Sequence, residues 1–441
     1  MSKKSTKALA SAALMSLVLT TALSAGPVKA AQGKVTRVSG ADRYATASQV
    51  ATTNWESGSD SVVLVSGEGY ADAVSASALA KKLGAPILLT EPGSLNADAQ
   101  KALDTLKPKN VYVIGGNASI SQSIRDGLKD KYTLTELGGA NRYETNAAVA
   151  DELVKLGVDA SNVLVVGGEG FSDALSVAPV AAAKGQILLL ATNDQAKTQP
   201  VIDFVKKNNS KVTVVGTKNI INDTIYNALG ASSRVDGGAD RFATNIKVLN
   251  NFQGDLKSDK VYIANASKAT PDNLYADALV ASAVAGKYSA PLVLVDKDPS
   301  GSTTNPNATD NAIAYLKDNT TSSTDFQVIG GTGVVSENTV EAIDDIYNNP
   351  SPEGEVKSIE TNGLNEIKVV FNQEVDSDTA EDITNYKVDG TTLNDKGTAD
   401  NDETPDENSA KAVLQDDNKT VVIKLAKAQK QSDDIDVTVK K

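Results

Sequence analysis

One phrase that pairs a polar residue with arginine and an aromatic residue recurs three times. The copies are GADRYATA from Gly40, GANRYETN from Gly139 and GADRFATN from Gly238, so consecutive copies start 99 residues apart. An arginine guanidinium suits phosphate or carboxylate because its planar fork can donate two parallel hydrogen bonds. The preceding acid or amide can instead cap a helix that begins there. Both interpretations stay open for these residues: Asp42, Arg43, Asn141, Arg142, Asp240 and Arg241.

A second recurring phrase supplies one carboxylate per copy. Asp72 lies in GEGYADA, Asp173 in GEGFSDA and Asp277 in LYADA, each after a short apolar run and before an alanine-rich stretch. One interpretation is that these acids cap helices at strand-to-helix turns. The other places them at the carboxyl ends of parallel strands, where open α/β sheets bind ligands. Three such acids could also hold a cation, so calcium is left open and no other cofactor is expected.

Composition removes most catalytic chemistries. The 441 residues include no histidine and no cysteine, which excludes Ser-His-Asp triads, Cys-His pairs and His-rich zinc sites. One acid per copy, with no second acid at a fixed spacing, is poor support for two-carboxylate hydrolysis. GEGYADA also lacks the third glycine of a dinucleotide fingerprint, because Asp72 stands there. The sequence therefore favours a binding protein over an enzyme, with no metal ligand set predicted.

Charge and hydropathy limit the partners. The formal net charge is −13, which argues against a nucleic-acid partner and requires a local basic site for any anionic one. Residues 1–30 combine Lys3, Lys4 and Lys7 with an apolar stretch, and small residues end at Ala30. This pattern predicts a secretory signal peptide. No later apolar run is long enough to cross a membrane, so no membrane partner is expected.

The repeated phrases mark three units of about 100 residues. We expect them at 36–132, 133–233 and 234–349. In each unit, unbroken apolar runs such as SVVLVSG, PILLT and NVYVIGG alternate with helical stretches, which indicates a parallel sheet covered on both faces. In the first helix, Tyr44, Ala47, Val50 and Ala51 share one face. The predicted fold class is α/β, with three Rossmann-like modules. Two polar insertions, at 264–278 and 296–311, set the third unit apart.

Residues 354–441 have a different pattern, which is typical of β-strands and not of alternating strands and helices. Apolar and polar residues alternate from Glu366 to Val375, and KTVVIKLAKAQ and DIDVTVKK are further strand candidates. Pro350 and Pro352 suggest a hinge before this region. The pattern predicts a small all-β sandwich of immunoglobulin type.

Taken together, the phrases resemble the clostridial cell wall binding repeat, often called cell wall binding repeat 2. The resemblance rests on the GADRYATA-like and GEGYADA-like phrases followed by GAPILLT and VYVIGG, and it covers about 315 residues. It implies three Rossmann-like modules in a pseudo-threefold arrangement. The second unit departs from the pattern at Gly185-Gln186 and Gly216-Thr217. The tail resembles the immunoglobulin-like domains of bacterial S-layer proteins.

The resemblance also implies a function. We expect a non-catalytic, secreted protein of a Gram-positive cell surface, held non-covalently by an anionic cell-wall glycopolymer. Such a protein would be an S-layer component, with other S-layer proteins as further partners, or a surface-display protein. Two alternatives are a peptidoglycan hydrolase of amidase or autolysin type, and an adhesin that acts through the immunoglobulin-like part. The polymer-binding residues would be the three arginines, their preceding Asp or Asn residues, and the three acids of the second phrase. Linked weak contacts would add up through effective concentration.

Overall fold

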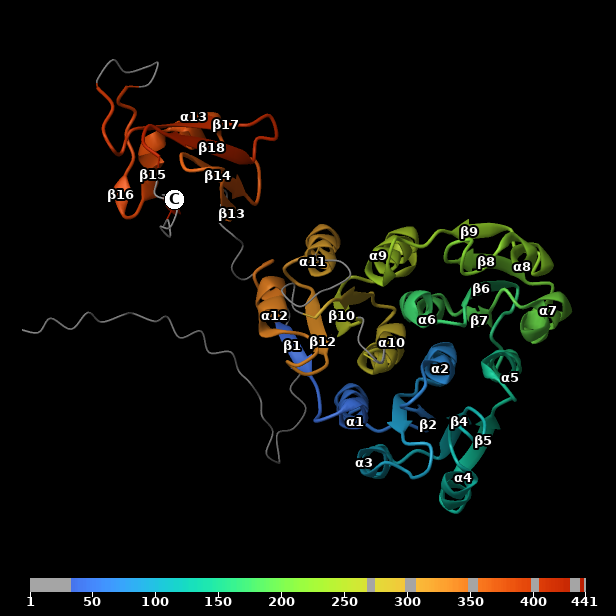
Figure 1. The fold of residues 1–441 in the computed structure, drawn as a ribbon. Helices are drawn as coiled ribbons and strands as arrows, with labels where there is room; N and C mark the ends of the chain where they lie inside the picture. Colours follow the sequence, from blue (N-terminus) through green and yellow to red (C-terminus); the bar gives the residue numbers. More distant parts are fainter. Residues whose placement is uncertain are drawn as a thin grey trace, which may run out of the picture. The chain divides into compact units, whose positions relative to one another are not determined.

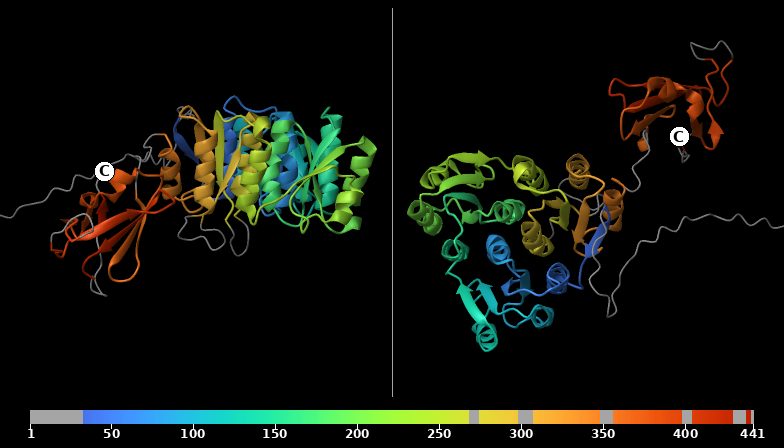
Figure 2. Two further views of the ribbon diagram at one scale, coloured as in Figure 1. Left: turned by 90° about the horizontal axis from the view of Figure 1, so that it is seen from above. Right: turned by 180° about the vertical axis from the view of Figure 1, so that it is seen from behind.

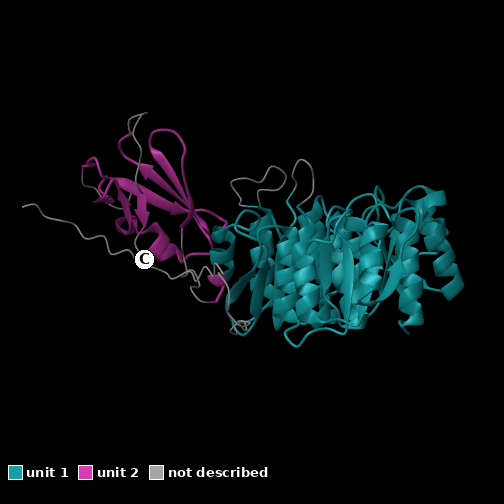
Figure 3. Cartoon of the chain, turned by 90° about the horizontal axis from the view of Figure 1, so that it is seen from below, with its two compact units in different colours: residues 1–343 teal, residues 344–441 magenta. Residues whose placement is uncertain are grey.

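The computed structural model describes residues 33–267, 274–297, 307–347, 356–397, 404–428 and 437–439. The chain divides into two compact units, residues 1–343 and 344–441 (Figure 3). The predicted signal peptide and the proline hinge lie outside the described residues, as do parts of both insertions of the third repeat, 268–273 and 298–306.

The described part of the first unit contains three four-stranded sheets, and every strand pairing in them is parallel. This confirms the predicted α/β class with three parallel-sheet modules. The first sheet has the order β3-β2-β4-β5 and the second β7-β6-β8-β9, while the third has β11-β10-β12-β1. The bounds are β2 Ser61–Ser66, β3 Ile87–Thr90, β4 Asn110–Ile114, β5 Thr133–Leu137, β6 Asn162–Gly167, β7 Ile187–Ala191, β8 Lys211–Val215, β9 Ser233–Val235, β10 Lys260–Asn265, β11 Leu292–Val295, β12 Asp325–Ile329 and β1 Val35–Val38.

Four kinds of helix recur around the sheets. One follows the arginine phrase: α1 Arg43–Asn54, α5 Arg142–Lys155 and α9 Arg241–Asn251. A second kind is rich in alanine: α2 Tyr70–Leu83, α6 Ser172–Lys184 and α10 Ala276–Tyr288. The others are α3 Ala97–Leu106, α7 Gln195–Asn208 and α11 Ala308–Asn319, then α4 Gln122–Lys129, α8 Asp223–Ala228 and α12 Glu337–Asp344, with a short turn η1 at Gln253–Asp255. Gly84 ends α2 in the left-handed conformation, at φ 63°, as the sequence predicts.

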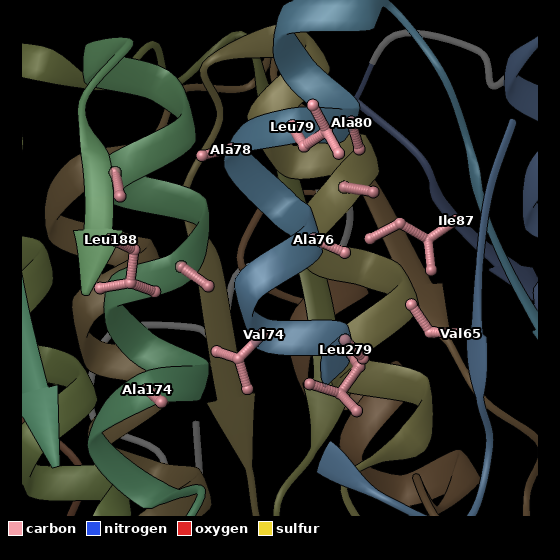
Figure 4. Packing of buried hydrophobic residues seen from close by; sticks show 14 of the residues in the cluster. Val65, Val74, Ala76, Ala78, Leu79, Ala80, Ile87, Ala174, Leu188 and Leu279 are labelled. Carbon is pink, nitrogen blue, oxygen red and sulfur yellow. The ribbon is translucent and has the colours of Figure 1, made fainter. Parts of the chain in front are cut away.

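The three alanine-rich helices pack against one another at the centre of the first unit, and the three sheets lie around them (Figures 1 and 2). Figure 4 shows the small and branched apolar side chains that fill this region, which are almost fully buried. Small residues permit the close approach: a Cβ added to Gly286 would lie 2.7 Å from the Cβ of Ala182. The arrangement has the pseudo-threefold character that the resemblance implies.

Each sheet ends in a short strand that the sequence reading missed. β5 and β9 directly precede the arginine phrase of the next repeat but pair with the sheet of the repeat before. β1 precedes the first phrase and completes the third sheet, where Val35 lies beside Phe326. The sheets are therefore offset from the predicted repeat boundaries, which remain predictions, and the beginning of the ring joins its end.

The described part of the second unit is dominated by antiparallel strands. One sheet has the order β13-β14-β18-β17 and the other β16-β15-β19. Along β14, Ile367, Val369 and Phe371 are buried, which confirms the predicted alternation. The all-β character is confirmed, and the immunoglobulin-like assignment stays a proposal. The bounds are β13 Val356–Thr361, β14 Glu366–Phe371, β15 Tyr386–Val388, β16 Thr391–Thr392, β17 Ala410–Leu414, β18 Thr420–Leu425, β19 Val437–Val439, α13 Ser377–Glu381 and η3 Ile383–Asn385.

Candidate functional site

The residue before each arginine caps a helix. The Asp42 carboxylate accepts from the backbone N–H groups of Tyr44 and Ala45, both at 2.9 Å. Asn141 does the same at the start of α5 and Asp240 at the start of α9. The capping interpretation is therefore confirmed for these three residues. They satisfy backbone donors that the first helical turn leaves free.

The glycine that opens each phrase lets the loop turn tightly onto its helix. A Cβ on Gly40 would lie 2.3 Å from the Cβ of Ala45, and Gly139 and Gly238 are equally crowded. The Gly40 N–H donates to Thr46 Oγ1 at 3.0 Å, and this bond recurs in both other copies. The spacing of glycine and threonine thus fixes the loop that presents the arginine.

The three arginines lie at the junctions between repeats. Each guanidinium donates to a carbonyl just beyond the first strand of its own repeat: Arg43 to Gly67 at 2.6 Å, Arg142 to Gly168 at 2.5 Å and Arg241 to Ala266 at 3.0 Å. Each also lies over an aromatic side chain of the preceding repeat, and the third repeat takes this place for the first. The guanidinium carbon is 5.9 Å from the ring centre of Tyr275 for Arg43, 5.1 Å from Tyr70 for Arg142 and 4.6 Å from Phe171 for Arg241. All three arginines are half-buried.

The aromatic residues form a cluster that the sequence reading did not identify. Tyr70, Phe171 and Tyr275 contact one another with ring centres 4.9 to 5.8 Å apart. They stand at the amino-terminal ends of the three central helices, so the cluster lies where those helices converge. The signal was present in the sequence, because an aromatic residue stands two positions before the acid in all three copies of the second phrase.

The acids of the second phrase do not cap their helices. The N-cap positions of α2, α6 and α10 are Gly69, Phe171 and Tyr275, and none makes a side-chain capping bond. Asp72, Asp173 and Asp277 lie two or three positions further on, inside the first turn. The capping interpretation is therefore wrong for this set. Their placement agrees with the alternative, because α2 and α6 begin just after the carboxyl ends of β2 and β6, and α10 is the helix that follows β10 after the insertion. Ligand binding by these acids stays a prediction.

Each of these acids is pressed against a glycine that follows a neighbouring strand. A Cβ built on Gly115 or Gly216 would lie 2.5 Å from Oδ2 of Asp72 or Asp173, and the distance from Gly330 to Asp277 would be 2.8 Å. The three glycines also have φ values of 115°, 117° and 123°, which side chains rarely adopt. The first glycine of VYVIGG, VTVVGT and FQVIGG is therefore required in all three repeats, and Thr217 replaces only the second.

Burial shapes the protonation of these carboxyl groups. It raises the pKa of Asp173 and of Asp277 to about 6 because the charged form loses water, and the charge of Arg43 opposes this rise at Asp277. Burial also raises the pKa of Asp72, while a hydrogen bond with Ser119 and the charge of Arg142 counteract it. The positions equivalent to Ser119 hold Ile220 and Val334, so the first repeat gives its acid the most polar surroundings.

A second set of arginines supports the same glycines and was missed entirely. Arg37 donates to the Gly330 carbonyl at 2.8 Å, Arg125 to that of Gly115 at 2.7 Å and Arg234 to that of Gly216 at 2.7 Å. Arg37 and Arg234 come from the last strand of their sheets, whereas Arg125 comes from α4. These side chains hold the glycine turns in place.

A pocket of about 430 Å³ opens at the junction of the first and second repeats. Its walls bring the second phrase of one repeat against the first phrase of the next, and Tyr275 of the third repeat also lines it. The other polar side chains in its lining are Glu68, Tyr70, Asp72, Ser119, Asn141, Arg142 and Thr145. Acceptors, donors and aromatic rings in one hollow suit a hydroxyl-bearing ligand such as a sugar.

The structure thus brings two of the three predicted arginines close to a predicted acid of the preceding repeat. The charge of Arg142 reaches Asp72, and that of Arg43 reaches Asp277. Within the described residues, no group of three or more acids gathers in a way that could hold a metal ion. No helix in the described part of the chain is long and apolar enough to cross a membrane.

Comparison with known proteins identifies these repeats. The model of the family described as cell wall binding domain 2 (CWB2) matches residues 37–125, 136–226 and 236–341. An amidase enhancer of Bacillus subtilis is 31% identical over 264 residues, which are 59% of this chain and 35% of that protein. The N-acetylmuramoyl-L-alanine amidase LytC of Bacillus subtilis is 28% identical over 271 residues, 61% of this chain and 52% of LytC. The chain thus spans about half or less of the length of these curated relatives.

Solved structures agree with the fold. Cwp6 from Clostridium difficile has a TM-score of 0.62 at 25% identity, over 74% of this chain and 51% of Cwp6. Cwp8 from the same organism has a TM-score of 0.61 at 24% identity, over 71% of this chain and 52% of Cwp8, and its likeness concerns the fold alone.

Proposed function

Because the chain belongs to the cell wall binding domain 2 family, we propose that its three repeats hold it non-covalently to an anionic secondary glycopolymer of the Gram-positive cell wall. The family makes it a cell wall binding protein of the cell surface. Within that role we propose a secreted S-layer component or surface-display protein, in which the second unit is an immunoglobulin-like spacer. Other S-layer proteins would be its further partners.

The observation that carries this proposal is the repeated junction of arginine, acid and aromatic ring. Each arginine keeps one edge tied to a backbone carbonyl and one face on a ring, so its position is fixed before any ligand arrives. A fixed guanidinium suits an anionic group, and the neighbouring acid accepts from sugar hydroxyls. Three modest contacts on one chain then reinforce each other.

In this proposal the site residues have separate tasks. Arg43, Arg142 and Arg241 meet the polymer directly. Their helix caps Asp42, Asn141 and Asp240 set the loops, and the acids of the second phrase, Asp72, Asp173 and Asp277, form the floor. The pocket at Asp72 and Arg142 is the place proposed for a sugar unit, because it brings an acid, an arginine and aromatic rings together.

The test is sedimentation of the protein with purified cell walls before and after acid extraction of their secondary polymers. We expect co-sedimentation with intact walls and its loss after extraction. The R43Q/R142Q/R241Q variant should weaken binding at least about tenfold, because each substitution removes a charge-assisted contact. R43K/R142K/R241K, which keeps the charges but loses the forks, should fall between this variant and the unaltered protein.

The matched control is K101Q/K131Q/K206Q, which removes three positive charges from exposed positions. It should bind like the unaltered protein. Equal binding by the arginine variant and this control would remove the arginines from the site. Equal binding to extracted walls would remove the anionic polymer as the ligand.

A wall-hydrolase function is the second candidate, because one relative is an amidase. The matched residues form the binding domain of the family, and the chain contains no histidine. A zymogram with embedded peptidoglycan decides between the two. A clearing band from the purified chain would favour the hydrolase.

A further inference from the structure

Three lysines gather at the end of the central helices opposite to the arginine junctions. Lys81 and Lys287 lie in the last turns of α2 and α10, and Lys257 lies beside them, since its N–H donates to the Ser289 carbonyl at 2.8 Å. Lys287 follows Asp277 by ten residues, which places it about 15 Å further along the helix. This group, called the lysine cluster below, is separate from the junction pocket and contributes no residue to its lining.

The cluster lies where the first and third repeats meet. Lys81 Nζ donates to the Lys287 carbonyl at 2.9 Å and contacts Ser289 Oγ at 3.4 Å. Lys287 Nζ donates to the Asn54 carbonyl and lies 4.2 Å from the ring centre of Trp55. Lys81 can approach the central axis because the equivalent positions on α6 and α10 hold only Ala182 and Gly286.

Within the described part of the chain, no carboxylate forms an ion pair with the cluster. Among the described residues, no ion pair includes Lys81, Lys257 or Lys287. Burial lowers the pKa of Lys81, and the charge of Lys257 lowers it further. Burial also lowers the pKa of Lys287, and Glu56, which forms no ion pair with it, opposes the effect. The fold therefore keeps positive charges together at a cost that a bound anion would offset.

The junction of the second and third repeats provides an internal comparison. There Lys184 lies 5.3 Å from the ring centre of Phe252, much as Lys287 lies over Trp55. Lys184 is neutralised by Asp255 at 2.6 Å. At the junction of the third and first repeats the aromatic ring is kept and the pairing acid is not. Lysines often donate hydrogen bonds to the free carbonyls at helix C-termini, and this explains part of their placement here. It does not explain why one junction has a pairing acid and the other does not.

We propose that the lysine cluster is a binding site for an oxyanionic group, a phosphate or a carboxylate, at the opposite end of the repeat ring from the junction pocket. An ammonium has three donors, and the contacts above use one or two of them on each of the half-buried lysines, Lys81 and Lys287. The remaining donors of Lys81 and Lys287, with the exposed Lys257, can converge on one compact anion. The site gives this acidic protein the local basic surface that an anionic partner requires.

The chain carries its own reporter for this site, because Trp55 is its single tryptophan and contacts Lys287. We would titrate the whole protein with sodium tripolyphosphate, and separately with polygalacturonate, at constant ionic strength while following tryptophan emission. Equilibrium dialysis with the same two probes gives a second readout. A saturable response to either probe is expected, and the probe that binds distinguishes phosphate from carboxylate.

The deciding variant is Lys81→Met, which keeps an apolar stem of similar length but removes the charge and does not touch Trp55. It should weaken binding roughly tenfold, the usual effect of losing one charge-assisted hydrogen bond. Lys81→Arg should bind nearly as well as the unaltered protein, and K101M, which removes an exposed charge elsewhere, should bind equally well. Unfolding midpoints check that all variants are folded.

Two results would overturn the proposal: no saturable response of the unaltered protein to either probe, or equal affinity for Lys81→Met and the unaltered protein. Tripolyphosphate and polygalacturonate are not bacterial wall polymers, but either could also bind the arginine junctions. The effect of Lys81→Met on the affinity therefore decides between the lysine cluster and the junctions, and failure of one proposal does not decide the other.

Discussion

Asp173 and Asp277 have carboxyl groups that the fold holds against a glycine and away from water. Their first-turn position favours the charged form through the helix dipole, but burial outweighs this and raises both pKa values to about 6. In the folded protein these groups therefore stay protonated to a higher pH than in the unfolded chain. A group of this kind stabilises the fold fully below its unfolded pKa, and that contribution is lost as the pH rises through its folded pKa.

We therefore predict that the free energy of unfolding of the first unit falls as the pH rises from about 4 to about 6, because these two carboxyl groups lose their protons. Asp173→Asn and Asp277→Asn should each flatten this slope, by about 1–3 kcal/mol over the interval. Urea unfolding at a series of pH values measures it. Asp318→Asn, at an exposed position, should leave the slope as it is. A slope unchanged in both buried-site variants would mean that other groups control this pH range.

The residue scale also shows what a sequence can predict about a site. Six of the nine predicted residues recur at fixed positions in one phrase, and their capping and arginine roles follow from that phrase. The supporting arginines Arg37, Arg125 and Arg234 share a target but no position, because Arg125 reaches its carbonyl from a helix and the others from a strand. In the first repeat Glu136 occupies the strand position and pairs with Arg125 at 2.8 Å. Comparison of the repeated motifs could not identify these arginines, because the residue that binds the glycine carbonyl lies on a strand in two repeats and on a helix in the other.

At the scale of elements, the buried strands and central helices were predictable because their apolar runs are long and unbroken. The last strand of each sheet was not. β1, β5 and β9 are three to five residues long, mix polar with apolar residues, and expose part of their surface. Their place depends on a partner strand rather than on their own composition, and for β1 that partner lies at the far end of the ring.

A helix-to-strand clamp joins two of the three junctions. Asn146 of α5 donates to Leu188 of β7 at 2.9 Å and to Ser75 of α2 at 3.0 Å, and it accepts from the N–H of Leu190 at 2.8 Å. Asn245 repeats these contacts with Leu292, Leu294 and Ser176. At the third junction the equivalent residues are Ala47 and Val280, both buried. Asparagine and serine are thus present together or replaced together.

We predict that Asn146→Ala costs about 2–4 kcal/mol of unfolding free energy, because it leaves buried polar groups without partners. Ser75→Val alone should also destabilise the protein, since it leaves one N–H of the Asn146 amide without an acceptor. The double variant N146A/S75V copies the third junction, so it should cost about 1–2 kcal/mol less than the sum of the single variants. Urea unfolding of the four proteins measures this coupling. Simple additivity would show that the two residues act independently.

At the scale of the whole first unit, closure of the ring depends on one short strand. β1 supplies the Val38 carbonyl to the Gly330 N–H at 3.0 Å, and Thr36 Oγ1 donates to the Phe326 carbonyl at 3.1 Å. Arg37 adds bonds to the Gly330 carbonyl and to Glu337. Without β1, β12 would become the edge of the third sheet, next to one of the glycine turns that face the acids.

We predict that deleting residues 34–38 lowers the free energy of unfolding by about 2–4 kcal/mol, the scale of several lost hydrogen bonds. It should also speed amide hydrogen exchange in residues 325–329, whereas exchange in 110–114 and 211–215, whose sheets keep their last strands, should change little. Hydrogen exchange read by mass spectrometry measures all three segments. Equal protection of 325–329 with and without residues 34–38 would show that β12 does not need its neighbour.

The pairing of β1 with β12 has a kinetic consequence. Thr36 and Phe326 are 290 residues apart, whereas the first two sheets draw their last strands from the next stretch of chain. Loop closure over so many residues is slow, and folding slows as contacts become less local. Refolding should therefore show two early phases and a late one, in which the third module stays incomplete and exposes a bare strand edge. During synthesis, β1 is made long before β12, so it must wait for β12 before the third sheet can be finished.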